Sequence, residues 1–139
     1  MIKIILAGTL SCASISHAYD VQNIYDRIVA ANPEVRVVPI IVKKGVLSWC
    51  SVACNTGKEI IIAEETLSIV SNEDELAGMI GHEEGHFTYK NEMQADLLGL
   101  QYAESAGYNY CKAAQIIKTY EGDDVHPTGA IRYKNTGCQ

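Results

Sequence analysis

Two histidines and a glutamate occur at a spacing that suits metal-assisted hydrolysis. The segment His82-Glu83-Glu84-Gly85-His86 is an HExxH sequence. Residues i and i+4 lie on one helix face, so both imidazoles can reach one Zn²⁺ ion at about 2.0–2.1 Å. Glu83 follows the first histidine and can act as a general base toward water without occupying the metal. The alternative interpretation is a helix with two surface histidines and scattered acids.

Two acids downstream extend this pattern. Glu92 supplies an oxygen ligand, and two histidines with one glutamate leave a fourth position open, as in catalytic zinc sites. Asp96 follows one turn later and can accept the N–H of a ligand histidine, which fixes the tautomer of that ring. Taken alone, Glu92 reads as a solvated acid at a helix start and Asp96 as a surface charge. Beside the HExxH sequence, we predict that both belong to the site.

The connection between the two motifs has to turn. On a continuous helix, Glu92 would lie about 240° around the helix axis from His86 and could not reach the same ion. We therefore expect a turn between Phe87 and Asn91, with Asn91 capping the second helix. Gly85 leaves room for another element to approach the first helix closely.

The hydrophobic pattern predicts an α+β domain with a short sheet. The first two strands would form a hairpin through Lys43-Lys44-Gly45, and the sheet would pack on the active-site helix and the two helices that follow. The tail from Asp123 to Gln139 reads as turn-rich. The expected helices cover residues 20–31, 71–88, 92–105 and 110–120, with a helical turn or two over 64–70, and the expected strands cover 35–42, 46–53 and 59–63.

The first eighteen residues have the pattern of a secretory signal peptide. Lys3 supplies a positive charge, an apolar stretch follows, and Ser16-His17-Ala18 fits a cleavage site before Tyr19. The domain would then cover residues 19–139. The alternative is a buried N-terminal helix or strand. Thr9 stands where a lipobox needs leucine, which argues against a lipid anchor at Cys12.

Four cysteines remain after such cleavage, namely Cys50, Cys54, Cys111 and Cys138. An even number in an exported chain predicts two disulfides, and three pairings are open. The rival reading, a Cys-x3-Cys metal site, lacks a second pair of ligands at metal spacing. These cysteines and the N-terminal pattern predict a periplasmic or secreted protein.

Length and composition limit the remaining possibilities. A chain of 139 residues is one domain, and 47% hydrophobic with 20% charged residues is an ordinary globular balance. A net charge of −6 argues against nucleic acid as a partner. No apolar run long enough to cross a membrane occurs after the N-terminal segment. The pattern leaves the oligomeric state open.

The stretch from Asn72 to Gly107 resembles the zinc metallopeptidase family of HtpX and the CAAX prenyl endopeptidases, metallopeptidase family forty-eight among the gluzincins. NEDELAGMIGHEEGH resembles the active-site helix of that family, and Glu92-x-x-Ala-Asp96 resembles its third-ligand helix. His126-Pro127, with Arg132 downstream, resembles its C-terminal His-Pro signature, and Thr56–Leu67 its edge strand. The likeness extends from Val35 to Arg132. The connection between His86 and Glu92 is shorter than is usual in the family.

This resemblance implies a small zincin-like domain that binds one Zn²⁺ ion and cleaves proteins or peptides. The implied ligands are His82, His86 and Glu92, with Glu83 as general base. His126 is either a surface turn residue or a group that stabilises the oxyanion or caps the zinc. Arg132 is expected to pair with Asp96 or Glu92. Substrate would lie along the strand residues Lys58, Glu59, Ile60, Ile61 and Ile62.

The favoured interpretation is a zinc endopeptidase that acts on extended or unfolded protein segments in the cell envelope. A second hypothesis is a zinc-containing binding module without turnover, such as a chaperone-like clamp or an inhibitor. The intact Glu83 weighs against it, because a pure binder needs no base. A third hypothesis is a disulfide-stapled domain without metal.

Overall fold

The computed structural model describes residues 19–45, 50 and 52–139, and over these residues the fold is α+β as predicted. The expected signal segment with Cys12, and most of the expected strand over 46–53, lie outside the described residues. The elements are α1 (Val21–Ala31), β1 (Ile40–Lys43), β2 (Ala53–Asn55), β3 (Ile60–Ala63), the 3₁₀ helix η1 (Glu64–Ser68), α2 (Glu73–Gly85), α3 (Glu92–Ser105), α4 (Tyr110–Ala114), the 3₁₀ helix η2 (Gln115–Thr119) and α5 (Gly129–Asn135).

The three strands form one sheet in the order β1-β3-β2. Strand β1 is parallel to β3, with Ile40 opposite Ile60, and β2 is antiparallel to β3, with Ala53 opposite Ile62. The expected hairpin between the first two strands is therefore wrong. The physical reason lies in β3, whose isoleucines are at most 2% exposed and so need neighbours on both edges and both faces.

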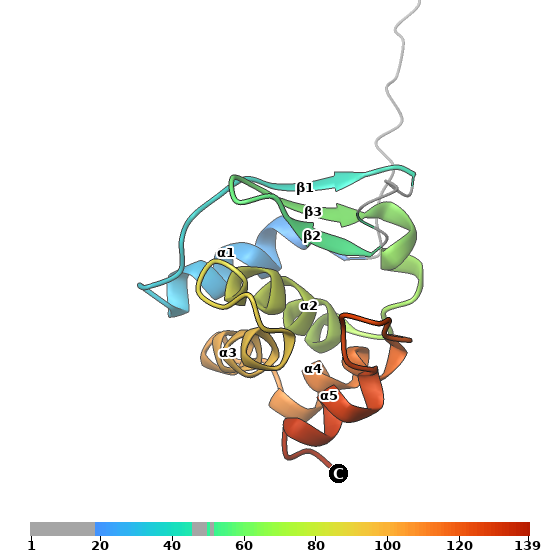
Figure 1. The fold of residues 1–139 in the computed structure, drawn as a ribbon. Helices are drawn as coiled ribbons and strands as arrows, with labels where there is room; N and C mark the ends of the chain where they lie inside the picture. Colours follow the sequence, from blue (N-terminus) through green and yellow to red (C-terminus); the bar gives the residue numbers. More distant parts are fainter. Residues whose placement is uncertain (1–18, 46–49, 51) are drawn as a thin grey trace, which may run out of the picture.

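The sheet covers one side of the helices, with α1 and α2 directly beneath it (Figure 1). Helix α1 begins at Asp20, whose carboxylate accepts the N–H of Asn23, and it buries Ile24, Tyr25 and Ile28 in the core. Helix α2 begins at Asn72, whose side chain accepts the N–H of Glu75. Such caps satisfy amide groups that have no partner within the helix. Helix α2 thus lies between the sheet and the remaining helices.

The C-terminal region is more ordered than the sequence predicts. The expected helix 110–120 is divided into α4 and η2, and helix α5 forms within the tail that reads as turn-rich. Helix α5 buries Arg132 and Tyr133, whose side chains contact residues from distant parts of the chain. A seven-residue helix is too short to be stable alone, so it forms here because those contacts hold it.

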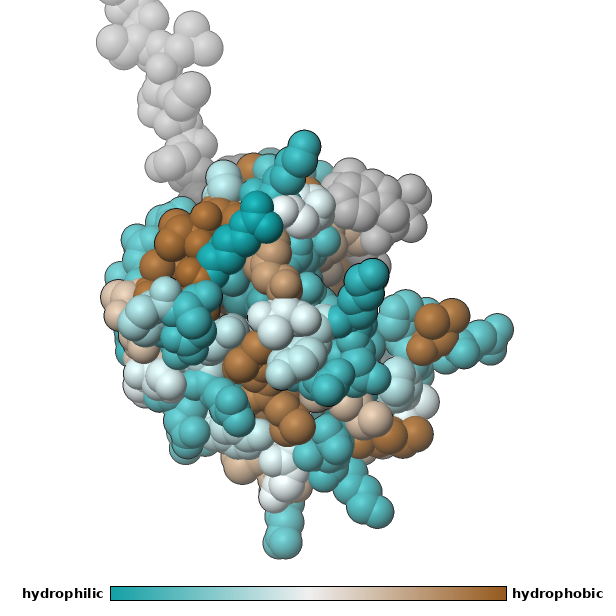
Figure 2. All heavy atoms as spheres, turned by 60° about the vertical axis from the view of Figure 1, so that its left-hand side comes forward, coloured by the Kyte–Doolittle hydropathy of each residue, from teal (hydrophilic) through white to brown (hydrophobic). Residues whose placement is uncertain are grey.

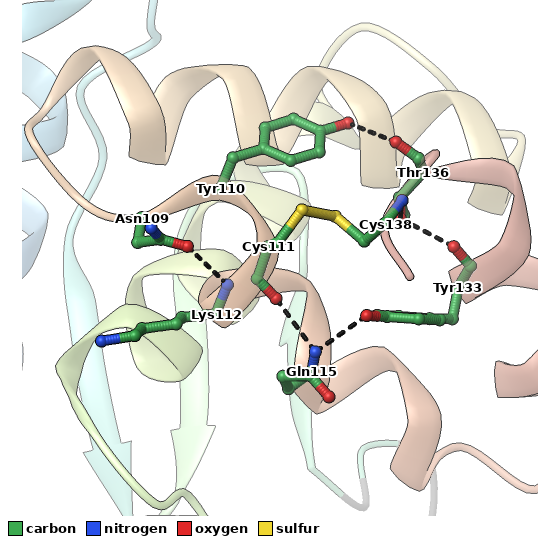
Figure 3. Close-up of a disulfide and its surroundings, with 8 residues drawn as sticks. All are labelled: Asn109, Tyr110, Cys111, Lys112, Gln115, Tyr133, Thr136 and Cys138. Atoms are coloured by element: carbon green, nitrogen blue, oxygen red, sulfur yellow. Dashed lines mark hydrogen bonds between the residues drawn. A yellow bond between two sulfur atoms is a disulfide. The ribbon is translucent and has the colours of Figure 1, made fainter.

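Both expected disulfides are present, with the pairs Cys50–Cys54 and Cys111–Cys138. The second joins α4 to the segment that follows α5 (Figure 3). Around it, the hydroxyl of Tyr110 donates to the Thr136 carbonyl, at 3.3 Å. The Gln115 amide donates to the Tyr133 hydroxyl at 2.8 Å. The end of the chain is therefore fastened to α4 and η2.

Within residues 19–45, 50 and 52–139, no helix combines the length and the apolar character needed to cross a membrane. On the face shown in Figure 2, apolar side chains lie in groups separated by hydrophilic ones.

Candidate active site

Two imidazoles meet at the C-terminal end of α2. Helix α2 ends at Gly85, three residues earlier than expected, and His86 is its capping residue. His82 lies one turn before His86, and the Nε2 atoms of the two rings are 3.0 Å apart. The Nδ1 atom of His86 lies 2.9 Å from the Tyr89 carbonyl, which can only accept, so Nδ1 carries the proton and Nε2 keeps its lone pair. Both Nε2 atoms are thus placed for one shared cation.

The predicted turn after His86 is confirmed. The N–H groups of Phe87 and Tyr89 donate to the last carbonyls of α2, at 3.0 and 2.8 Å. Asn91 then begins α3, and its side chain accepts the N–H of Gln94 at 3.1 Å. The chain reverses within these few residues, so the first residue of α3 faces back toward the histidines.

Helices α2 and α3 can lie this close because glycines face each other where they cross. A Cβ atom on Gly81 would come within 2.2 Å of the Gly99 carbonyl oxygen, and one on Gly85 within 2.6 Å of the Ala95 carbonyl oxygen. Any side chain at these positions would force the helices apart. The expected role of Gly85 is therefore confirmed, and Gly81 with Gly99 extends it.

Glu92 completes a cluster with the two histidines. Its Oε2 atom lies 3.3 Å from His82 Nε2, and its Oε1 atom lies 3.4 Å from His86 Nε2. One ligand atom from each residue falls within 4.8 Å of the others. Neighbouring ligand atoms of a tetrahedral zinc ion are roughly 3.3 Å apart when the bonds are about 2.0–2.1 Å. Both the donor types and their separations fit zinc.

A buried ion pair supports the cluster from behind. Arg132 donates from Nε and Nη2 to the two carboxylate oxygens of Asp96, at 2.8 and 2.7 Å, and its Nη1 lies 3.3 Å from Glu92. Asp96 Oδ1 lies 2.9 Å from His82 Nδ1, a distance typical of an ion pair, although the N–H is not aligned for a full hydrogen bond. The structure thus brings together His82, Glu92, Asp96 and Arg132, as the sequence predicts.

These charges shift the pKa values of the cluster. Burial alone would raise the pKa of Asp96, but Arg132 and His82 hold that pKa below its usual range. Burial likewise opposes ionisation of Glu92, whose pKa is lowered by His82, His86 and Arg132. Burial disfavours the charged form of His82, yet Asp96 and Glu92 raise its pKa to about 9. Both carboxylates are ionised at neutral pH and can hold a cation.

Glu83 lies beside the cluster and is 6% exposed. Burial raises the pKa of its carboxyl group, while the neighbouring His82 and His86 act in the opposite direction. The Glu83 carbonyl accepts a 2.7 Å hydrogen bond from the side chain of Asn55, which fastens strand β2 to α2. A buried carboxyl group with a raised pKa beside a cation site is a candidate for general-base work.

The cluster opens into a cleft of about 1220 Å³. Its lining comes from strand β2 with the residues that flank it, from the C-terminal end of α2 and the start of α3, and from the segment between Thr119 and Pro127. The expected substrate strand is not placed at this cleft. Ile60, Ile61 and Ile62 belong to the central strand β3, whose two edges are both paired, and the adjoining Lys58 and Glu59 do not line the cleft. The strand edge that borders the cleft is that of β2.

His126 reaches the margin of the cluster. Its Nε2 atom lies 3.9 Å from Glu92 Oε1, and its ring lines the cleft. Sequence reasoning did not identify Asp123, which contacts the other ring nitrogen, or Tyr120, whose ring is stacked under the Arg132 guanidinium at 4.6 Å. The signal for Asp123 was an Asp-x-x-His spacing, which lets an aspartate cap the backbone of a turn. Tyr120 had no comparable signal.

Comparison with known proteins gave a match to a family model. The family model of Peptidase family M48 matches residues 48–91, a segment that holds strand β2, the HExxH sequence and the turn that follows it. Comparisons with curated proteins and with solved structures gave no significant match. This chain is therefore similar to that family over the segment that bears Glu83 and the two histidines.

Proposed function

We propose that this protein is a zinc-dependent endopeptidase related to Peptidase family M48. The observation that carries the proposal is the cluster of His82, His86 and Glu92, whose donor types and separations fit one Zn²⁺ ion. The similarity to the family over residues 48–91 supports the same conclusion, because that segment bears the base and both histidines. When bound, zinc supplies a Lewis acid that polarises the scissile carbonyl and makes water more acidic.

The residues of the chain account for the proton transfers. Glu83 accepts a proton from the attacking water and passes it to the nitrogen of the leaving amine. Burial raises the pKa of its carboxyl group, which makes Glu83 a stronger base toward that proton than an exposed carboxylate. Asp96 holds the ring of His82, and Arg132 holds the carboxylates of Asp96 and Glu92. His126 lines the cleft where it can contact the substrate carbonyl.

The substrates we propose are extended or unfolded protein segments. The edge of β2 from Ala53 to Asn55 borders the cleft and can pair with an added strand through main-chain hydrogen bonds, which demand little of the substrate sequence. The bond between Asn55 and Glu83 keeps this edge at a fixed distance from the base. This edge replaces the Lys58–Ile62 segment as the proposed substrate strand.

We also propose that residues 1–18 are a signal peptide and that the domain works in the periplasm or outside the cell. The support is the sequence pattern of that segment together with the two disulfides, which persist in oxidising compartments.

A pair of substitutions tests the function. Glu83→Gln should keep one zinc ion per chain and lower chelator-sensitive cleavage of casein by roughly 10²–10⁴-fold, the usual contribution of a general base. Glu92→Ala should lose the zinc as well. Glu104→Gln, an exposed residue of α3, makes the same chemical change as the first variant and should leave both properties unchanged.

The zinc content and the cleavage rate together separate the three hypotheses. Zinc with cleavage that disappears in Glu83→Gln is the expected result. Zinc without any cleavage would reject the peptidase and indicate the binding module. A chain that takes up no zinc would reject both and indicate a structural domain.

A further inference from the structure

The hydrogen bonds between β2 and β3 decide which main-chain groups β2 directs away from the sheet. In an antiparallel pair, only every second residue exchanges hydrogen bonds with the partner strand. The Ala63 N–H donates to the Val52 carbonyl at 2.9 Å, and the Thr56 N–H donates to the Glu59 carbonyl at 3.0 Å. Val52, Cys54 and Thr56 therefore direct their main-chain groups toward β3.

Ala53 and Asn55 lie between those residues, so their N–H and C=O groups point to the opposite edge of β2. Among the described strands, β2 is the outermost on this side of the sheet, and both residues line the cleft. An extended chain can pair with this edge through two of its residues that are themselves two positions apart. The edge thus offers a bound chain few points of attachment, and their position relative to α2 decides what that chain meets.

The side chain of Asn55 connects this edge to the end of α2. In a continued helix the Phe87 N–H would donate to the Glu83 carbonyl, but here it donates to the Glu84 carbonyl, at 3.0 Å, because the chain turns after His86. The Glu83 carbonyl instead accepts a hydrogen bond from Asn55 Nδ2, at 2.7 Å. The strand therefore satisfies a carbonyl group that the helix end leaves without its usual partner.

The other end of the Asn55 amide is also bonded. Its Oδ1 atom accepts the Gly57 N–H at 2.6 Å, within a turn where Gly57 has a φ of +82°. Because the Glu83 carbonyl can only accept and the Gly57 N–H can only donate, the amide has one orientation. Rotation of this side chain would break both hydrogen bonds.

We propose that Asn55 is a positioning residue, whose side chain sets the register between a chain paired with the β2 edge and Glu83. The main chain of Asn55 receives the bound segment, and its side chain holds the backbone of the base residue, so one peptide bond of the segment is presented to Glu83. The proposal rests on the proposed peptidase function for this base, whereas pairing with the edge can be measured without cleavage.

Two substitutions remove the connection to α2 and keep the turn. Asn55→Asp keeps an oxygen for the Gly57 N–H and replaces the donor to Glu83 with a second acceptor. Asn55→Ser is neutral, can accept the same N–H, and is too short to reach the Glu83 carbonyl. Asn23→Asp and Asn23→Ser, at an exposed position of α1, make the same chemical changes and are the matched controls.

The kinetic test uses the zinc-loaded chain and one extended peptide that the parent cleaves at a single bond. Both Asn55 variants should keep the zinc, lower kcat by roughly ten- to hundredfold because the reacting groups are misplaced, and cut neighbouring bonds as well. Mass spectrometry of the products identifies the bonds, and the Asn23 variants should match the parent. Loss of zinc, parent-like kinetics, or a slower reaction at the same single bond would each overturn the proposal.

Amide exchange followed by NMR tests the edge whether or not the chain cleaves anything. In zinc-loaded Glu83→Gln, the same peptide, or unfolded casein where no peptide is cleaved, should slow exchange at Ala53 and Asn55 but not at Cys54, which faces β3. The slowing should be weaker when Asn55→Ser is added. Equal slowing with and without that substitution, or none at these two amides, overturns the positioning proposal. Slowing that depends on Asn55 in a protein whose parent cleaves nothing overturns the proposed function alone.

Discussion

The disulfide between Cys111 and Cys138 should contribute most of the stability that crosslinks give this protein. It closes a loop of 27 residues, whereas Cys50–Cys54 closes one of 4. The chain-entropy relation gives roughly 3.5 kcal/mol for the longer loop and roughly 2 kcal/mol for the shorter one. The perturbation is the double substitution Cys111→Ala with Cys138→Ala, compared with the equivalent double substitution at the other pair.

The same disulfide has a second consequence for the site. Apart from the disulfide, two hydrogen bonds secure the tail, from Tyr110 to Thr136 and from Gln115 to Tyr133 (Figure 3). These neutral hydrogen bonds contribute about 1 kcal/mol each, less than the crosslink. Helix α5, which carries Arg132, would therefore fray more readily in the variant. Zinc should bind more weakly, because Glu92 and Asp96 lose the cation that orients them.

The free energy of unfolding is measured by urea titration of both double variants and the parent, each treated with chelator. Zinc titration of the folded proteins measures the effect on the site. The expected result is a larger loss of stability for the Cys111 and Cys138 variant than for the other, with weaker zinc binding in the first. An equal or smaller loss for the longer loop would refute the reasoning from loop length. Unchanged zinc affinity would refute the link through α5.

Two further predictions concern α2 and its contact with α3. Burial raises the pKa of Glu84 to about 7, so its contribution to stability is present below pH about 4.5 and is lost as the pH rises through 7. Glu84→Gln should be about 3 kcal/mol more stable than the parent at pH 8, because that is the free energy of a pKa raised from 4.5 to about 7, and equal at pH 4 in chelator-treated urea titrations; parallel pH profiles would contradict this. Gly81→Ala and Gly99→Ala should each lower the free energy of unfolding by roughly 2 kcal/mol, because the added methyl group overpacks the contact between α2 and α3. This loss should outweigh the higher helix propensity of alanine. The control, Ser105→Ala at the exposed end of α3, should not destabilise the protein. Thermal unfolding of all three checks this, and stabilisation at Gly81 would show that the helices can separate freely.

The cluster could be predicted from the sequence because its parts are local. His82 and His86 are one helical turn apart, and the angle that separates Glu92 from them on a continuous helix required the turn that the structure contains. The cap at Asn91 was also readable, since asparagine just before a helical pattern is a favoured capping residue.

The remaining features depend on contacts between distant residues. The pairing of β1 with β3 follows from burial of the β3 isoleucines on both edges, which a single strand sequence does not reveal. Helix α5 depends on the partners of Arg132, which lie on α3. Glu84 is only 2% exposed because it faces the core opposite the histidines, although an acid between two ligand positions reads as solvated. Asp123 was missed because an exposed aspartate in a turn is common.

The order of the site residues along the chain has a consequence for the charges of the cluster. An exported chain emerges from its N-terminal end, so His82, His86 and Glu92 all emerge at least forty residues before Arg132. Until Arg132 follows, the carboxylates of Glu92 and Asp96 have only the two imidazoles and any captured cation to neutralise them. A chain that meets metal at this stage therefore has its acids compensated by the ion first, and the guanidinium of α5 can dock only afterwards.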